Sequence, residues 1–100
     1  MSRYRNENLR WDILVTLAYV PFSAFRLKAI LQALRPTGYD DLTETSLMGQ
    51  IKYLEEGGYV KIEESKNIVT EEEVLLVTIT KKGVDLLEKN IKDVGVKCGS

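Results

Sequence analysis

Residues 43–64, TETSLMGQIKYLEEGGYVKIEE, contain a helical pattern that is followed at once by a glycine pair and a strand pattern. The apolar residues of the first part recur at spacings of three and four, which predicts a helix that buries one stripe. These residues are Leu47, Ile51 and Leu54. Thr43 or Thr45 can cap the start of this helix with its hydroxyl, and Gly57-Gly58 predicts where the helix ends.

The stretch after the glycine pair predicts a β-hairpin. Tyr59, Val60 and Ile62 begin a strand, and the segments SKN and TEEE form a turn or loop. VLLVTIT at residues 74–80 then returns as a second strand that is rich in β-branched residues. Because a two-stranded ribbon is only marginally stable in water, we expect this hairpin to pack against helices.

Two further helices are predicted before residue 43. The first runs from about residue 7 to 19 and is closed by Pro21. Its inward-facing residues at helical spacing are Leu9, Ile13, Leu17 and Val20. Ser23 is a suitable N-cap for a second helix, from about residue 24 to 34. Its inward-facing residues are Leu27, Ile30, Leu31 and Leu34.

The C-terminal part predicts one more helix. Thr80 can cap KKGVDLLEKNI at residues 81–91, in which three apolar residues share a face. They are Val84, Leu87 and Ile91. The residues after about 92 show no pattern, so we expect a loose tail.

One hundred residues with 44% hydrophobic content can bury one modest core. The sequence therefore predicts a single domain over residues 1–100, with an ordered core from about 5 to 92. Three helices, a two-stranded wing and a C-terminal helix are the elements of an α+β fold of the winged helix-turn-helix type.

The chain resembles the small winged-helix proteins of Mu-like phages and prophages, which are labelled as regulators similar to the arsenic-repressor group. The resemblance rests on residues 20–64, on TITKKGVDLLEKN and on VGVK. LEEGGYV at residues 54–60 is similar to the family stretch Trp-Leu-Glu-x-Gly-Leu-Val, with Tyr53 where that family usually has tryptophan. TKKG at residues 80–83 resembles the start of the family's last helix. The resemblance implies a DNA-binding regulatory role.

A helix that reads double-stranded DNA presents small and polar residues to the major groove. The candidate DNA contacts on the outer face of the third helix are Thr45, Ser46, Gly49, Gln50, Lys52 and Tyr53. Arg26 and Lys28, together with Arg3 and Arg5, could bind phosphates. Glycine inside a helix costs about 1 kcal/mol relative to alanine, which indicates that something needs the space at Gly49. The alternative for the whole set is an ordinary solvated helix face.

The charge distribution opposes a conventional DNA footprint. Residues 1–35 carry six basic and two acidic residues, residues 36–73 carry three and ten, and residues 74–100 carry five and three. Negative charge is therefore concentrated on the third helix and the wing. Two explanations stay open: the acidic wing hangs clear of DNA, or the domain is a protein-protein interaction adaptor whose wing binds a basic partner.

The first helix is apolar on two faces, which favours a homodimer. The candidate dimer interface consists of Trp11, Val15 and Phe25, although Trp11 and Phe25 could equally belong to the core. A dimer would place two third helices about 34 Å apart, so its operator should be nearly palindromic.

The composition argues against an enzyme, because the chain has no histidine and its only cysteine, Cys98, lies near the end. Adjacent acidic residues such as Glu71 to Glu73 lack the spacing of a calcium loop and are expected to be solvated surface. We expect no cofactor and no metal. No apolar run approaches membrane-spanning length, so a cytoplasmic location without membrane contact is expected.

Overall fold

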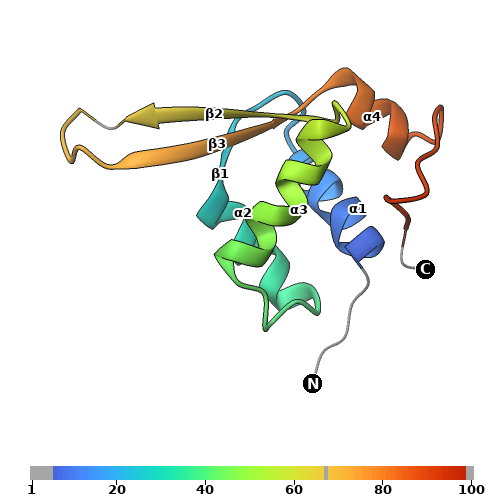
Figure 1. Cartoon of the computed structure of the whole chain (residues 1–100), viewed down its shortest axis with the longest axis horizontal. Coiled ribbons are helices and arrows are strands. Elements are labelled where there is room, and N and C mark those ends of the chain that lie inside the picture. Colours follow the sequence, from blue (N-terminus) through green and yellow to red (C-terminus); the bar gives the residue numbers. More distant parts are fainter. Residues whose placement is uncertain (1–5, 67, 99–100) are drawn as a thin grey trace.

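The computed structural model describes residues 6–66 and 68–98, which form four α-helices, one short 3-10 helix and a three-stranded antiparallel sheet. In chain order the elements are α1 (Asn6–Leu17), β1 (Phe25–Arg26), α2 (Leu27–Leu34), η1 (Arg35–Thr37), α3 (Glu44–Glu56), β2 (Val60–Lys66), β3 (Glu73–Ile79) and α4 (Lys81–Leu87). Helices α1, α2 and α3 pack together, and hairpin β2–β3 extends away from them along the longest dimension of the molecule, 43 Å (Figure 1). The predicted α+β class is confirmed.

Helix α3 has the start, the buried stripe and the end that its sequence predicts. The Thr43 hydroxyl accepts a hydrogen bond from the Ser46 amide at 3.2 Å and so caps the first turn. The three apolar residues Leu47, Ile51 and Leu54 are fully buried. At the other end Gly58 adopts a positive φ of 82°. The amides of Gly58 and Tyr59 donate to the carbonyls of Glu55 and Leu54, which is the Schellman arrangement that reverses the chain.

The hairpin predicted after α3 is present. Strands β2 and β3 pair in antiparallel register from Val60 opposite Ile79 to Lys66 opposite Glu73. Only the base of the hairpin contributes to the core, because Val60, Val77 and Ile79 are buried whereas the far end of β2 is exposed. The hairpin is therefore fixed at its base, and its tip extends into solvent.

A third strand, which the sequence did not predict, precedes α2. Phe25 and Arg26 pair with Val77 and Leu76 of β3, so β3 is the central strand of the sheet. The expected helix start at Ser23 is wrong, because this pairing holds Arg26 in an extended conformation with φ −72° and ψ 146°. Helix α2 begins at Leu27, and no side chain caps it.

Helix α1 ends two residues earlier than expected and buries a different set of residues. It ends at Leu17, and Val20 beyond it is 54% exposed, so its assignment to the inward stripe was wrong. Leu14 is fully buried instead. Once the helix ends, residues no longer return to the same face every third or fourth position, and the spacing of Val20 loses its meaning.

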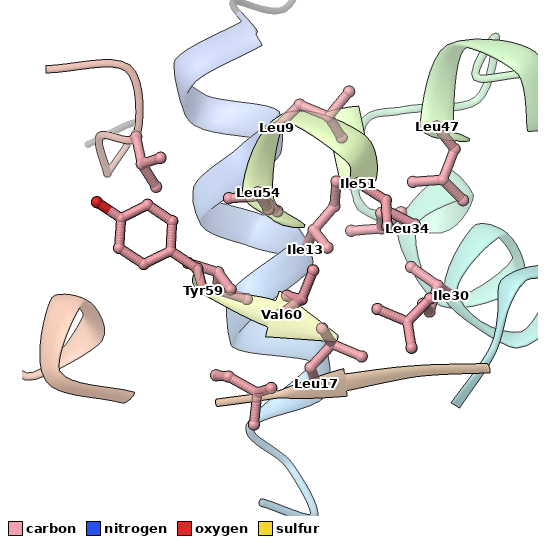
Figure 2. Close-up of a cluster of buried hydrophobic side chains, with 14 of the residues drawn as sticks. Leu9, Ile13, Leu17, Ile30, Leu34, Leu47, Ile51, Leu54, Tyr59 and Val60 are labelled. Atoms are coloured by element: carbon pink, nitrogen blue, oxygen red, sulfur yellow. The ribbon is translucent and has the colours of Figure 1, made fainter. Parts of the chain in front are cut away.

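The core joins the three N-terminal helices to the base of the hairpin. Figure 2 shows its labelled aliphatic side chains from α1, α2 and α3 gathered around strand residue Val60. Tyr59 lies at the margin of this cluster, with its ring buried and its hydroxyl directed away from the aliphatic side chains. Each fully buried aliphatic side chain of this core typically stabilises the fold by about 2 kcal/mol, because apolar surface is removed from water.

The C-terminal segment packs on the core. Helix α4 starts with the predicted Thr80 cap. It ends at Leu87, so Ile91 lies beyond the helix. The fully buried leucine of α4 is Leu86. Asp93 and Val96 then form an isolated antiparallel β-bridge, and Val96 is only 3% exposed. The Lys97 amide donates to the Glu7 carbonyl at 3.1 Å. The expectation of a loose tail is therefore wrong for residues 93–97.

Candidate nucleic-acid interface

The outer face of α3 is open to solvent along its length (Figure 1). Five of the six candidate DNA contacts on this helix are exposed. Thr45, Ser46, Gly49 and Lys52 form the open face, and Tyr53, which is 37% exposed, lies against Arg10 of α1. Lys52 supplies the only positive charge within α3, whose ends carry Glu44, Glu55 and Glu56. The middle of the helix is thus the part best suited to a phosphate or a base edge.

Gly49 lies in the centre of this face with open space around it. A Cβ built at this position would meet nothing within 4 Å. No neighbour in the described chain therefore requires glycine here, although glycine destabilises a helix interior by about 1 kcal/mol relative to alanine. The space is available to an external partner, as a close approach of nucleic-acid backbone would require.

The other two candidates on α3, Gln50 and Tyr53, are engaged by α1. The Arg10 Nε donates to the Gln50 Oε1 at 2.8 Å, and the Arg10 guanidinium lies 3.6 Å from the centre of the Tyr53 ring. A second nitrogen of Arg10 donates to the Gly95 carbonyl at 2.9 Å. Arg10 thus joins α1, α3 and the C-terminal segment. In this arrangement Gln50 and Tyr53 have a structural role.

The two candidate phosphate ligands before α3 lie beside carboxylates. Arg26 and Lys28 are exposed at the junction of β1 and α2, where they line a hollow of about 450 Å³. The acidic residues on its wall are Glu44, Glu72 and Glu73. Three carboxylates against two cations give this hollow a net negative charge. A phosphate would therefore be attracted only if it approached the two cations from the side away from the wing carboxylates. Arg3 and Arg5, the other predicted phosphate ligands, lie outside the described residues.

The wing is acidic up to its tip. Its exposed carboxylates are Glu63, Glu64, Glu71, Glu72 and Glu73. Between them Ile68 and Val69 are 92% and 91% exposed, at the end of the hairpin that is farthest from the helices (Figure 1). A tip of this composition would repel a phosphate backbone.

The candidate dimer residues have different environments. Trp11 and Phe25 are half-buried and pack against the core, which agrees with the alternative that they are core residues. Val15, one turn beyond Trp11 on α1, is 39% exposed. The largest exposed apolar side chains near α1 follow it along the chain: Tyr19, Val20 and Phe22. A run of apolar residues beside Pro21 was the sequence signal for this loop.

A tyrosine and a carboxylate fix the C-terminal segment. The Tyr59 hydroxyl donates to Asp93 Oδ2 at 2.6 Å, and the Gly95 amide donates to Oδ1 at 2.7 Å. These hydrogen bonds lower the pKa of Asp93, whereas burial, reinforced by the Asp93 carboxylate, raises the pKa of Tyr59 to about 12. Both groups are moved away from neutral pH, so this pair is a structural clamp and a poor proton donor or acceptor.

Neither a metal-ligand cluster nor a membrane-spanning helix is found among the described residues. Within residues 6–66 and 68–98, no three side chains of the histidine, cysteine and carboxylate types come together as a metal site. None of the helices in that part of the chain combines the length and apolar character needed to cross a bilayer. The sequence matches no known family model and none of the curated proteins.

Proposed function

We propose that this chain is a winged helix-turn-helix regulator of the phage or prophage type, in which α3 reads double-stranded DNA without a cofactor. The observation that carries the proposal is the exposed face of α3, where Gly49 leaves open space beside Lys52. The order of α2, α3 and hairpin agrees with such a fold. A homodimer and a nearly palindromic operator belong to the same proposal.

The contacts proposed for DNA are fewer than those expected from the sequence. Thr45, Ser46, Gly49 and Lys52 face the groove, while Arg26 and Lys28 bind the flanking phosphates. Gln50 and Tyr53 position α3 through Arg10. The wing turns its carboxylates away from the duplex. Binding by so few cations should be modest and strongly dependent on salt.

Fluorescence anisotropy with mixed-sequence duplex DNA tests this proposal. Three phosphate contacts correspond to a slope of about −2.7 in the logarithmic plot of affinity against salt, or about a 40-fold loss between about 50 and about 200 mM. Lys52→Ala should weaken binding and make the slope shallower by about 1, because one released counterion is lost. Lys81→Ala, which removes an exposed lysine of α4, should leave both unchanged. Absence of binding at low salt, or equal binding by the two variants, would refute the assignment.

The wing tip favours a second candidate function, an adaptor that binds a basic protein. Ile68 and Val69 are almost fully exposed between five glutamates, which is the pattern of an apolar anchor with an acidic rim. The partner would need an apolar pocket surrounded by lysine or arginine.

Replacing both tip residues with serine separates this candidate from the first. Ile68→Ser/Val69→Ser should change the free energy of unfolding by less than about 0.5 kcal/mol, because neither side chain is buried. It should leave DNA affinity intact but abolish retention of a basic protein that wild-type chain captures from a bacterial lysate at low salt. Val94→Ser, at a position that is 84% exposed elsewhere, is the matched control and should retain that protein. Retention by the tip variant would exclude the wing as the contact.

A further inference from the structure

We propose that a groove between α1 and the C-terminal segment binds a small amphipathic anion, a carboxylate with an acyl or aromatic body. The groove has a volume of about 280 Å³ and almost entirely apolar walls. Its apolar residues come from three parts of the chain: Trp11 of α1, Leu86 of α4, and Ile91, Val94 and Val96 of the C-terminal segment. Helix α4 and the C-terminal segment, which supply most of its lining, lie at the opposite end of the molecule from the tip of the hairpin (Figure 1).

Contacts within the fold itself shape the groove. Helix α4 ends at Leu87, and Lys89 has a positive φ of 63° that redirects the chain. The returning segment is fixed at several points. Asp93 accepts a hydrogen bond from the Tyr59 hydroxyl, Val96 is buried, and the Lys97 amide donates to the Glu7 carbonyl. This segment forms one wall of the groove without filling it. A preformed apolar site loses little conformational entropy when a ligand enters.

Charge around the groove selects the head group of the ligand. Lys89, Lys92 and Lys97 line it. Since the walls are almost entirely apolar, these lysines contribute mainly their aliphatic stems to the walls, and a stem of this length can bring its ammonium group to the rim. Asp93 is the only acidic residue among the lining side chains, and both of its oxygens already accept hydrogen bonds from Tyr59 and Gly95. An apolar floor beneath three ammonium groups is complementary to an anion with a hydrocarbon body.

The size of the groove limits the ligand. Pockets for small organic molecules begin at about 300 Å³, so this groove suits a single short acyl chain or one aromatic ring. A second copy of the chain is a less suitable occupant, because lysine is depleted from the cores of protein interfaces and a two-fold contact would bring the rim lysines of both copies together.

The single tryptophan of the sequence, Trp11, lines the groove and reports its occupancy. Decanoate should produce a saturable change in Trp11 fluorescence, measured below its micellar concentration. Decanol, which has the same chain without the charge, should bind at least about fivefold more weakly, because pairing with partly exposed lysines is worth up to about 1 kcal/mol each. Decyltrimethylammonium should bind more weakly still.

Two variants and a matched control complete the test. Lys92→Gln/Lys97→Gln should remove the preference for decanoate over decanol, whereas Lys61→Gln/Lys66→Gln on β2 should retain it. Val94→Glu places a carboxylate at an exposed edge of the groove and should lower decanoate affinity more than decanol affinity. Circular dichroism checks that every variant folds. An unsaturable response, equal affinity for decanoate and decanol, or a Trp11 change that depends on protein concentration alone would overturn the proposal, the last by showing a second copy in the groove.

Discussion

Gly83→Ala is expected to destabilise the protein by about 3 kcal/mol, near the upper end of the usual cost of overpacking. An alanine Cβ at Gly83 would lie 2.5 Å from the Tyr59 carbonyl oxygen and 2.7 Å from Cγ1 of Ile79. The carbonyl cannot move aside cheaply, because it accepts the Thr80 amide at 3.0 Å at the junction between the hairpin and α4. Helix α4 must therefore shift and loosen its contact with the core.

Gly49→Ala is the matched control for this prediction, since both glycines lie within α-helices and the substitution adds the same methyl group. Nothing lies within 4 Å of the Cβ position at Gly49, so alanine there should stabilise the protein by up to about 1 kcal/mol. Urea unfolding followed by circular dichroism measures both effects, which should have opposite signs. Equal effects of the two substitutions would show that α4 does not pack against Tyr59 and Ile79 as described.

The Gly49 variant also bears on the proposed function. If nucleic-acid backbone approaches α3 at this position, the added methyl group should weaken DNA binding while it strengthens folding. A variant that becomes both more stable and equally active would indicate that Gly49 has no functional reason to be glycine. Stability and binding therefore need to be measured on the same preparation.

The central part of the fold is predictable because its signals are local. Leu47, Ile51 and Leu54 repeat at helical spacing, Gly58 provides the positive φ that reverses the chain, and the alternation after it matches the paired register of the hairpin. Each signal is carried by residues within two turns of helix or one strand pair. No information about distant parts of the chain is needed.

The features that local sequence patterns do not predict depend on distant partners. Strand β1 is two residues long, and Phe25 and Arg26 are extended only because β3 is available beside them. The contact of Arg10 with Gln50 spans 40 residues, so an arginine on a helix surface gave no hint that it removes two α3 side chains from the candidate site. Exposure of Thr45, Gly49 and Lys52 could be predicted, since position on the helix determines it.

The hydrogen bond between Tyr59 and Asp93 should stabilise the fold by about 2 kcal/mol at neutral pH, because hydrogen bonds to charged groups contribute more than neutral ones. Asp93→Asn, Tyr59→Phe and the double variant form a cycle that isolates this coupling energy. Each variant is unfolded in urea, and the coupling is the excess of the two single effects over the double effect. Loss of the bond should also release residues 93–97 and increase hydrogen exchange at the Lys97 amide.

The coupling should vanish at both extremes of pH, with a sign fixed by each pKa. The pKa of Asp93 is lower in the folded state than its unfolded value of about 3.9, so its contribution is present above that value and is lost as pH falls through the folded pKa. The pKa of Tyr59 is about 12 when folded and about 10 when unfolded. Its contribution is complete below about 10 and is lost as pH rises through about 12.

A second buried tyrosine provides the control for this cycle. The Tyr39 hydroxyl donates to the carboxylate of Asp12 on α1, a pair that shares no hydrogen-bond partner with Tyr59 and Asp93. Tyr39→Phe and Asp93→Asn should therefore have additive effects on the free energy of unfolding. A coupling between Tyr59 and Asp93 that stayed constant as pH falls through the folded pKa of Asp93 would contradict a charge-assisted bond, because protonated Asp93 accepts a hydrogen bond from a hydroxyl only weakly.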